Sequence, residues 1–102
     1  MVDLSGIRVA KRRIAPYIHK TPVLTSSSLD EMTETKLYFK CENFQKTGSF
    51  KFRGATNAVL QLSKKDILKG VATASSGNHG AALSKAVSNR GGITKVVMPK
   101  NT

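Results

Sequence analysis

VATASSGNHGAALSKAVSNRGGITKVVM, residues 71–98, is the stretch of this chain that decides its fold. Residues 71–74 are small and predict a short strand, residues 79–87 predict a helix, and residues 94–98 predict a second, buried-type strand. The helix residues expected to face inward are Ala82, Leu83, Ala86 and Val87. A strand, a helix and a strand in this order favour a right-handed parallel crossover, so the chain is expected to be α/β with a Rossmann-like parallel sheet.

The same stretch also predicts that this sheet is incomplete. Two parallel strands cannot cover themselves, and sheets of this kind need helices on both faces. No helical pattern follows the strand at 94–98, which ends four residues before Thr102. We therefore expect a three-layer sheet that is truncated at the C-terminus.

The residues before this stretch predict two longer helices. One begins near Leu4, with Asp3 or Ser5 as its cap, and Pro16 should kink or close it. The other begins at Phe50. Apolar residues recur at helical spacing in both, at Leu4, Ile7, Ala10, Ile14 and Ile18, and at Phe52, Ala55, Val59 and Leu62.

Shorter elements complete the expected order. Residues 29–33 predict a short helix capped by the serines before it, and residues 36–40 predict a strand. Residues 43–49 read as a polar loop, and residues 64–69 as a turn of helix that Gly70 ends.

Composition excludes several classes of protein. No apolar run approaches the roughly 20 residues of a membrane span, and no signal peptide is visible, so we expect a cytoplasmic protein without a membrane partner. The net charge is +11, which is typical of nucleic-acid binders. However, the basic residues are scattered and not interleaved with aromatics, so no nucleic-acid partner is predicted. Cys41 is the single cysteine and the histidines are two, His19 and His79, so no metal site is expected.

Lys51 is the first candidate for chemistry. Most helical lysines are solvated and have no catalytic role. Lys51, however, lies between Phe50 and Phe52 where a loop meets a helix. Aromatic, partly dry surroundings and a helix N-terminus both disfavour the ammonium form, which a nucleophilic lysine has to lose. Both interpretations remain open on these residues alone.

The loop SSGNHG, residues 75–80, is the second candidate. It joins a predicted strand to a predicted helix, and Gly77 permits a tight backbone turn. Free N–H groups at the start of the helix would suit a carboxylate or a phosphate. An ordinary capped turn explains the same residues equally well.

Longer motifs resemble one family. The segment KCENFQKTGSFKFRGA, residues 40–55, resembles the lysine motif of the serine racemase and threonine dehydratase family, and SSGNHG resembles its substrate loop. HKTPVL, residues 19–24, and VVMP, residues 96–99, also look like family segments in the right order. The resemblance runs from about residue 7 to residue 98.

This resemblance implies a fold-type II pyridoxal-phosphate enzyme, similar to the tryptophan synthase β-subunit. Lys51 would form the Schiff base with the cofactor, Phe50 would pack on its pyridine ring, and Asn78 would hydrogen-bond its phenolic oxygen. The substrate carboxylate would lie on the loop of Ser75, Ser76, Gly77, Asn78 and His79. In serine racemases the serine that matches Ser76 acts as acid and base opposite the lysine. Many threonine dehydratases carry alanine there, so Ser76 favours racemase or hydroxyaspartate ammonia-lyase activity.

The family also continues beyond the motifs found here. Its glycine-rich phosphate loop and its later acidic residues have no counterpart in this chain. Residues 1–69 would be the first segment of the large cofactor-binding domain, and residues 70–102 the first half of the small domain. We expect a partial amino-acid racemase or ammonia-lyase acting on serine, threonine or hydroxyaspartate, homo-oligomeric at full length and inactive as this short chain. The alternative is a non-catalytic product that pairs with a full-length subunit.

Overall fold

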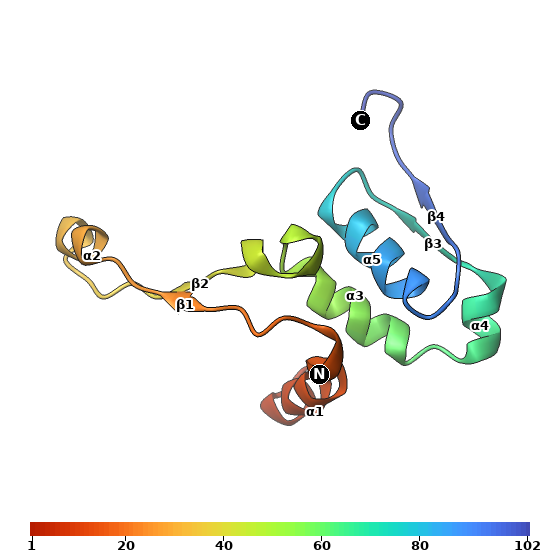
Figure 1. Cartoon of the computed structure of the whole chain (residues 1–102), viewed down its shortest axis with the longest axis horizontal. Helices are drawn as coiled ribbons and strands as arrows, with labels where there is room; N and C mark the ends of the chain where they lie inside the picture. The colour runs from red at the N-terminus through yellow and green to blue at the C-terminus, as the bar shows by residue number, and fades with distance from the viewer.

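A computed structural model describes the whole chain, Met1–Thr102. Strands β3 (Val71–Ala74) and β4 (Thr94–Val97) pair in parallel, with Val71 opposite Thr94 and Ala74 opposite Val97. Helix α5 (Asn78–Ser88) connects them, as Figure 1 shows. The parallel strand–helix–strand unit is therefore confirmed.

The core lies between α5 and α3 (Lys51–Leu60). Helix α4 (Lys64–Lys69) adds Ile67 to this core. Gly92, between α5 and β4, lies close against the side chain of Ile67. A Cβ at Gly92 would lie 2.8 Å from the side chains of both Ile67 and Val87, so only glycine fits there. All the helix residues that the apolar spacing placed inward on α5 are buried. The buried cluster consists of Phe52, Ala55, Val59, Ile67, Ala82, Leu83, Ala86 and Val87.

Helices α3 and α5 run in the same direction. Just beyond the end of α5, the Arg90 guanidinium donates to the carbonyls of Val59 and Leu62 at the C-terminal end of α3. The two helices have 10 and 11 residues, so they are almost equally long. Their first residues, Lys51 and Asn78, therefore begin at the same end of the pair, as can be followed in Figure 1.

The N-terminal helix differs from the sequence prediction. Asp3 caps α1 (Leu4–Ile14) by accepting a 2.7 Å hydrogen bond from the Gly6 N–H. The helix then tightens into the 3₁₀ turn η1 (Ala15–Tyr17), because Pro16 cannot continue an α-helix. Of its predicted inward face only Ile14 is buried, whereas Leu4 and Ile7 are exposed.

Residues 22–41 form an arm that extends from the rest of the chain (Figure 1). It carries α2 (Ser27–Thr33), capped by Ser26, and the two-residue antiparallel strands β1 (Val23–Leu24) and β2 (Phe39–Lys40). The strand predicted at 36–40 is shorter in the structure, where only Phe39 and Lys40 pair with β1. The radius of gyration is 16.7 Å, against roughly 13 Å for a compact domain of this length.

The sheet is covered on one side only. Helix α5 contacts both strands, and the residues of β3 and β4 alternate between half-buried and exposed. The predicted domain boundary between residues 69 and 70 stays a prediction, since the core draws on both sides of it. None of the helices combines the length and the apolar character that a membrane span needs.

Candidate functional site

The loop before Lys51 is tightly turned. Its polar residues form two 3₁₀ turns, η2 (Glu42–Phe44) and η3 (Lys46–Gly48). Thr47 has φ 61° and Gly48 has φ 76°, so two successive residues adopt the left-handed conformation. That conformation is strained for a β-branched threonine, and such strain is concentrated at functional sites.

Lys51 is the first residue of α3 and is exposed. Its Nζ lies 5.2 Å from the centroid of the Phe50 ring, which is 62% exposed. The dry surroundings predicted for Lys51 are therefore wrong for this chain. Phe52 does not enclose the amine, because its side chain is fully buried in the α3–α5 core.

The SSGNHG loop is organised by one hydroxyl. The Ser75 Oγ accepts hydrogen bonds from the backbone N–H groups of Gly77, at 3.2 Å, and Gly80, at 3.0 Å. The N–H groups of Asn78 and His79 have no acceptor in the structure. Two donors at a helix start thus remain free for an anion, as the loop motif predicts.

The two groups of predicted residues lie at one end of the helix pair, but they do not share a cavity. A hollow of about 290 Å³ lies along the loop, and Ser75, Ser76 and Gly77 line it. Its far side is formed by Gly80, Ala81, Ser84, Val96 and Met98. Neither Lys51 nor Asn78 lines this hollow.

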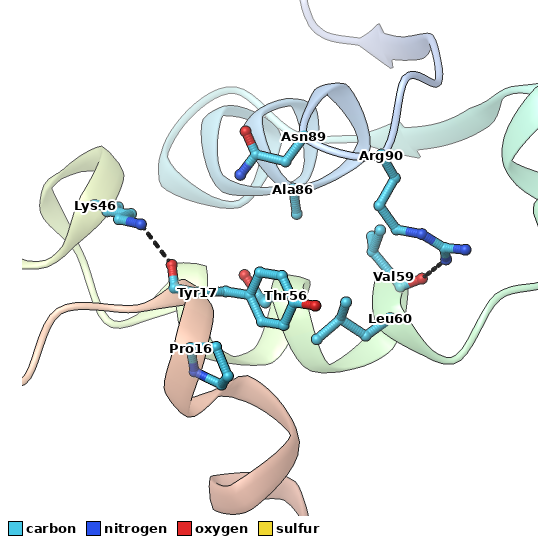
Figure 2. Close-up of a pocket in the computed structure, with 9 residues that line it drawn as sticks. All are labelled: Pro16, Tyr17, Lys46, Thr56, Val59, Leu60, Ala86, Asn89 and Arg90. Carbon is cyan, nitrogen blue, oxygen red and sulfur yellow. Dashed lines mark hydrogen bonds between the residues drawn. The ribbon is translucent and has the colours of Figure 1, made fainter.

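A different cavity, of about 240 Å³, lies between η1, α3 and α5 (Figure 2). Lys46 crosses one side of it and donates to the Tyr17 carbonyl at 2.7 Å, while Arg90 closes the other side. None of the predicted site residues lines this cavity. We therefore place the candidate site at the N-terminal ends of α3 and α5.

The sequence analysis did not predict a polar cluster that contacts α3 at Arg53, two residues after Lys51. Glu42 accepts hydrogen bonds from the Arg53 guanidinium, through Nε and through Nη2 at 2.9 Å, and from the Thr21 hydroxyl at 2.5 Å. Lys40 Nζ donates to the Thr21 carbonyl at 2.8 Å. We call these four residues the clasp. Lys40, Glu42 and Arg53 all fall inside the lysine motif at residues 40–55. Their opposite charges were the only feature of the sequence that could have indicated this cluster.

The Glu42–Arg53 contact stabilises the charged form of both side chains. The hydrogen bond from Arg53 lowers the pKa of Glu42 from 4.5 to about 2, with help from Thr21 and against the opposing effect of burial. In turn, Glu42 raises the pKa of the Arg53 guanidinium. The ion pair is therefore formed at any pH near neutrality.

A buried amide ties the same loop to the N-terminal segment. The side chain of Gln45 is almost fully buried. Its Oε1 accepts from the His19 and Lys46 N–H groups, and its Nε2 donates to the His19 carbonyl at 2.8 Å. Three hydrogen bonds engage both polar atoms of this buried amide, so Gln45 is a structural residue of the loop.

The comparisons with known proteins identify the family of this chain. The family model described as "Pyridoxal-phosphate dependent enzyme" matches residues 14–102. This chain belongs to that family. The serine racemase of Dictyostelium discoideum is 55% identical over 100 residues, which cover 98% of this chain and 31% of the racemase. The β-hydroxyaspartate dehydratase of Paracoccus denitrificans is 55% identical over 91 residues, covering 89% of this chain and 29% of that protein.

The solved structures lead to the same family. Maize serine racemase superimposes with a TM-score of 0.92 at 50% identity, covering 97% of this chain and 31% of that one. This confirms the predicted fold-type II architecture and the predicted pyridoxal phosphate cofactor. The chain spans about a third of the length of the relatives that it matches.

The residues present fit this cofactor. The Lys51 amine is exposed beside the open face of the Phe50 ring, and the Asn78 side chain is exposed without a hydrogen-bond partner. An aldehyde can reach such an amine, a flat ring can stack on such a face, and an amide can donate to a phenolic oxygen. Lys51, Phe50 and Asn78 are all solvent-exposed.

Proposed function

We propose that this chain is the lysine-bearing portion of a pyridoxal-phosphate-dependent amino-acid racemase or ammonia-lyase. The observation that carries the proposal is the shared end of α3 and α5. One helix starts there with the exposed amine of Lys51, and the other with the free N–H groups of Asn78 and His79. A lysine amine that can hold the cofactor and a helix start that can bind a carboxylate, placed at one end of the same helix pair, suit a cofactor-dependent reaction of an α-amino acid.

The substrate class follows from the loop. The free N–H groups bind a carboxylate, helped by the positive end of the α5 dipole. Serine, threonine and hydroxyaspartate share an α-carboxylate and a β-hydroxyl, and two relatives that are 55% identical to this chain are named for serine and β-hydroxyaspartate. We assign the hollow beside Ser76 to the substrate side chain.

Each residue then has a defined task. The cofactor, when bound, stabilises negative charge at the substrate α-carbon as an electron sink. Lys51 Nζ holds the cofactor and moves the α-proton on one face. Ser76 Oγ moves a proton on the opposite face, which is the requirement for racemisation. Phe50 and Asn78 orient the cofactor ring.

Substitution of Lys51 tests the assignment of the lysine. Pyridoxal phosphate trapped with borohydride should label Lys51 in the wild-type chain, and Lys51→Ala should lose that labelled peptide. Lys64→Ala, which alters an exposed lysine of α4, is the matched control and should label Lys51 normally. Labelling spread evenly over all lysines of the wild type would contradict the role of Lys51.

Substitution of Ser76 tests the two-face arrangement. The chain is joined to the C-terminal portion of a relative, so that the whole family fold is present. Ser76→Ala should then lose racemase activity and retain part of its elimination activity, because only racemisation needs a proton on the second face. Equal loss of both activities, with cofactor still bound, would rule out a face-specific role for Ser76.

Pairing with a second subunit is the other candidate function. The outer edge of β4 is unpaired, and Val97 on it is 62% exposed. An exposed apolar strand edge is a template for another chain. Co-expression with a full-length relative, followed by size-exclusion chromatography, distinguishes a mixed oligomer from separate species.

A further inference from the structure

The clasp of Thr21, Lys40, Glu42 and Arg53 has no place in the chemistry proposed above. It is the most extensive polar network in the chain, and it reaches α3 two residues after Lys51. It joins three segments that are separate in sequence: the chain before β1, the end of β2 with η2, and the first turn of α3. Its location suggests an influence on the first turn of α3.

Helix geometry shows what this influence would be. Successive residues of an α-helix are rotated by about 100°. Phe52 points into the core and is fully buried. Lys51 and Arg53 therefore lie on either side of it. Phe52 in the core and Arg53 in the clasp fix the rotation of the first turn at two points, and this leaves Lys51 to project away from both.

The first turn needs such an attachment. Phe50 occupies the N-cap position and offers no side-chain hydrogen bond to the helix. The other bonds of this turn are long: the Ser49 hydroxyl accepts from the Lys51 N–H at 3.3 Å, and the carbonyls of Ser49 and Phe50 accept from the next two N–H groups at 3.5 and 3.2 Å. Helix ends with few capping bonds fray, and Lys51 is the first helical residue. A bidentate Arg–carboxylate pair supplies both strength and a fixed direction.

We propose that the Glu42–Arg53 pair is a positioning device that sets the direction of the Lys51 amine. In this proposal Glu42 and Arg53 act only through the first turn of α3, as positioning residues. The inference rests on the proposed role of Lys51 as the cofactor lysine.

The test measures how selectively Lys51 reacts in the 102-residue chain. Pyridoxal phosphate is the probe, borohydride traps the product, and peptide mass spectrometry quantifies labelling at every lysine. In the wild type Lys51 should react faster than the other lysines. Arg53→Ala should slow labelling at Lys51 about tenfold, the effect of one charged hydrogen-bonded pair, and leave the other lysines unchanged. Arg53→Lys should recover part of the rate, because it restores the charge without the two-bond geometry.

A second variant and a control separate positioning from general stability. Glu42→Gln should reproduce the loss at Lys51. Lys69→Gln breaks an exposed ion pair with Asp66, 3.8 Å long, and should leave Lys51 labelling unchanged. Hydrogen exchange should show lower protection at the Arg53 amide and unchanged protection along α5.

Each adverse outcome has one meaning. Lys51 preference in the wild type that survives Arg53→Ala would overturn the positioning role alone. A loss of preference that accompanies lower protection throughout α5 would also overturn it, because the pair would then serve only the stability of the fold. No preference for Lys51 in the wild type would instead overturn the proposed function on which the inference rests.

Discussion

Replacing Glu42 by glutamine should destabilise the chain in a pH-dependent way. Glutamine is almost isosteric with glutamate and still accepts a hydrogen bond from Thr21, but it cannot form the ion pair with Arg53. The variant therefore removes the one negative charge of the clasp with little change in packing. We expect the free energy of unfolding to fall at neutral pH.

The structure gives the size of this effect. Lowering the pKa of Glu42 from 4.5 to about 2 corresponds to about 3 kcal/mol in favour of the folded chain at neutral pH. Solvent reaches the pair, since the side chains of Arg53 and Glu42 are 31% and 15% exposed. Screening therefore reduces the expected loss to about 2 kcal/mol.

The pH dependence has a definite sign. Because folding lowers the pKa of this carboxyl, its stabilisation is complete above 4.5, the unfolded value, and is lost as the pH falls toward 2. The difference between the wild type and Glu42→Gln should thus be largest at pH 7. At pH 3 it should fall to less than half of that value.

Urea unfolding followed by circular dichroism, from pH 7 to pH 3, measures this difference. Glu31→Gln, at an exposed position of α2, is the matched control and should change stability by less than about 0.5 kcal/mol at each pH. A Glu42→Gln difference of the same size at pH 3 and at pH 7 would refute the reasoning. It would mean that packing, and not the charge of Glu42, carries the effect.

Three further predictions concern the fold around the site, and unfolding experiments check all of them. Phe52→Ala empties a fully buried position and should cost about 3–5 kcal/mol, whereas Phe50→Ala, at a ring that is 62% exposed, should cost less than about 0.5 kcal/mol; equal costs would contradict the placement of the two rings. Gly92→Ala forces a methyl group against two buried side chains and should destabilise by about 1–3 kcal/mol. Gly54→Ala, in open space within α3, should stabilise by up to about 1 kcal/mol, and the opposite order would show that the close approach at Gly92 is absent. Ser75→Ala removes the acceptor of two backbone N–H groups, so it should cost about 1–2 kcal/mol and speed hydrogen exchange at those amides, which unchanged exchange would disprove.

The sequence predicted the order of the main helices and strands, although not the two-residue strand β1. Apolar spacing alone identified the inward face of α5, a run of small residues identified β3, and an apolar run ended by Pro99 identified β4. The start of α1 was predicted at a choice of two caps, of which Asp3 is the one used. These features follow from rotation per residue and from local hydrogen bonding, which depend only on residues near one another in the chain.

The sequence could not predict which side chains surround the site residues. The flanking phenylalanines suggested a dry Lys51, but one ring lies in the core and the other lies open to solvent. Burial of a side chain depends on what packs over it, and the sequence around Lys51 does not contain that information. For the same reason the apolar face predicted for α1 is mostly exposed.

What the sequence determined by itself was the family, the cofactor and the order of the helices and strands other than β1, because motif residues and apolar periods are local features of the chain. Only the tertiary structure decided that α3 and α5 start at the same end of the helix pair, and that the clasp contacts the first turn of α3 next to Lys51. Arg90 reaches the carbonyl of Val59 across 31 residues, and Thr21 approaches Arg53 across 32. Contacts between such distant residues form only when the chain has packed, so no local pattern can encode them.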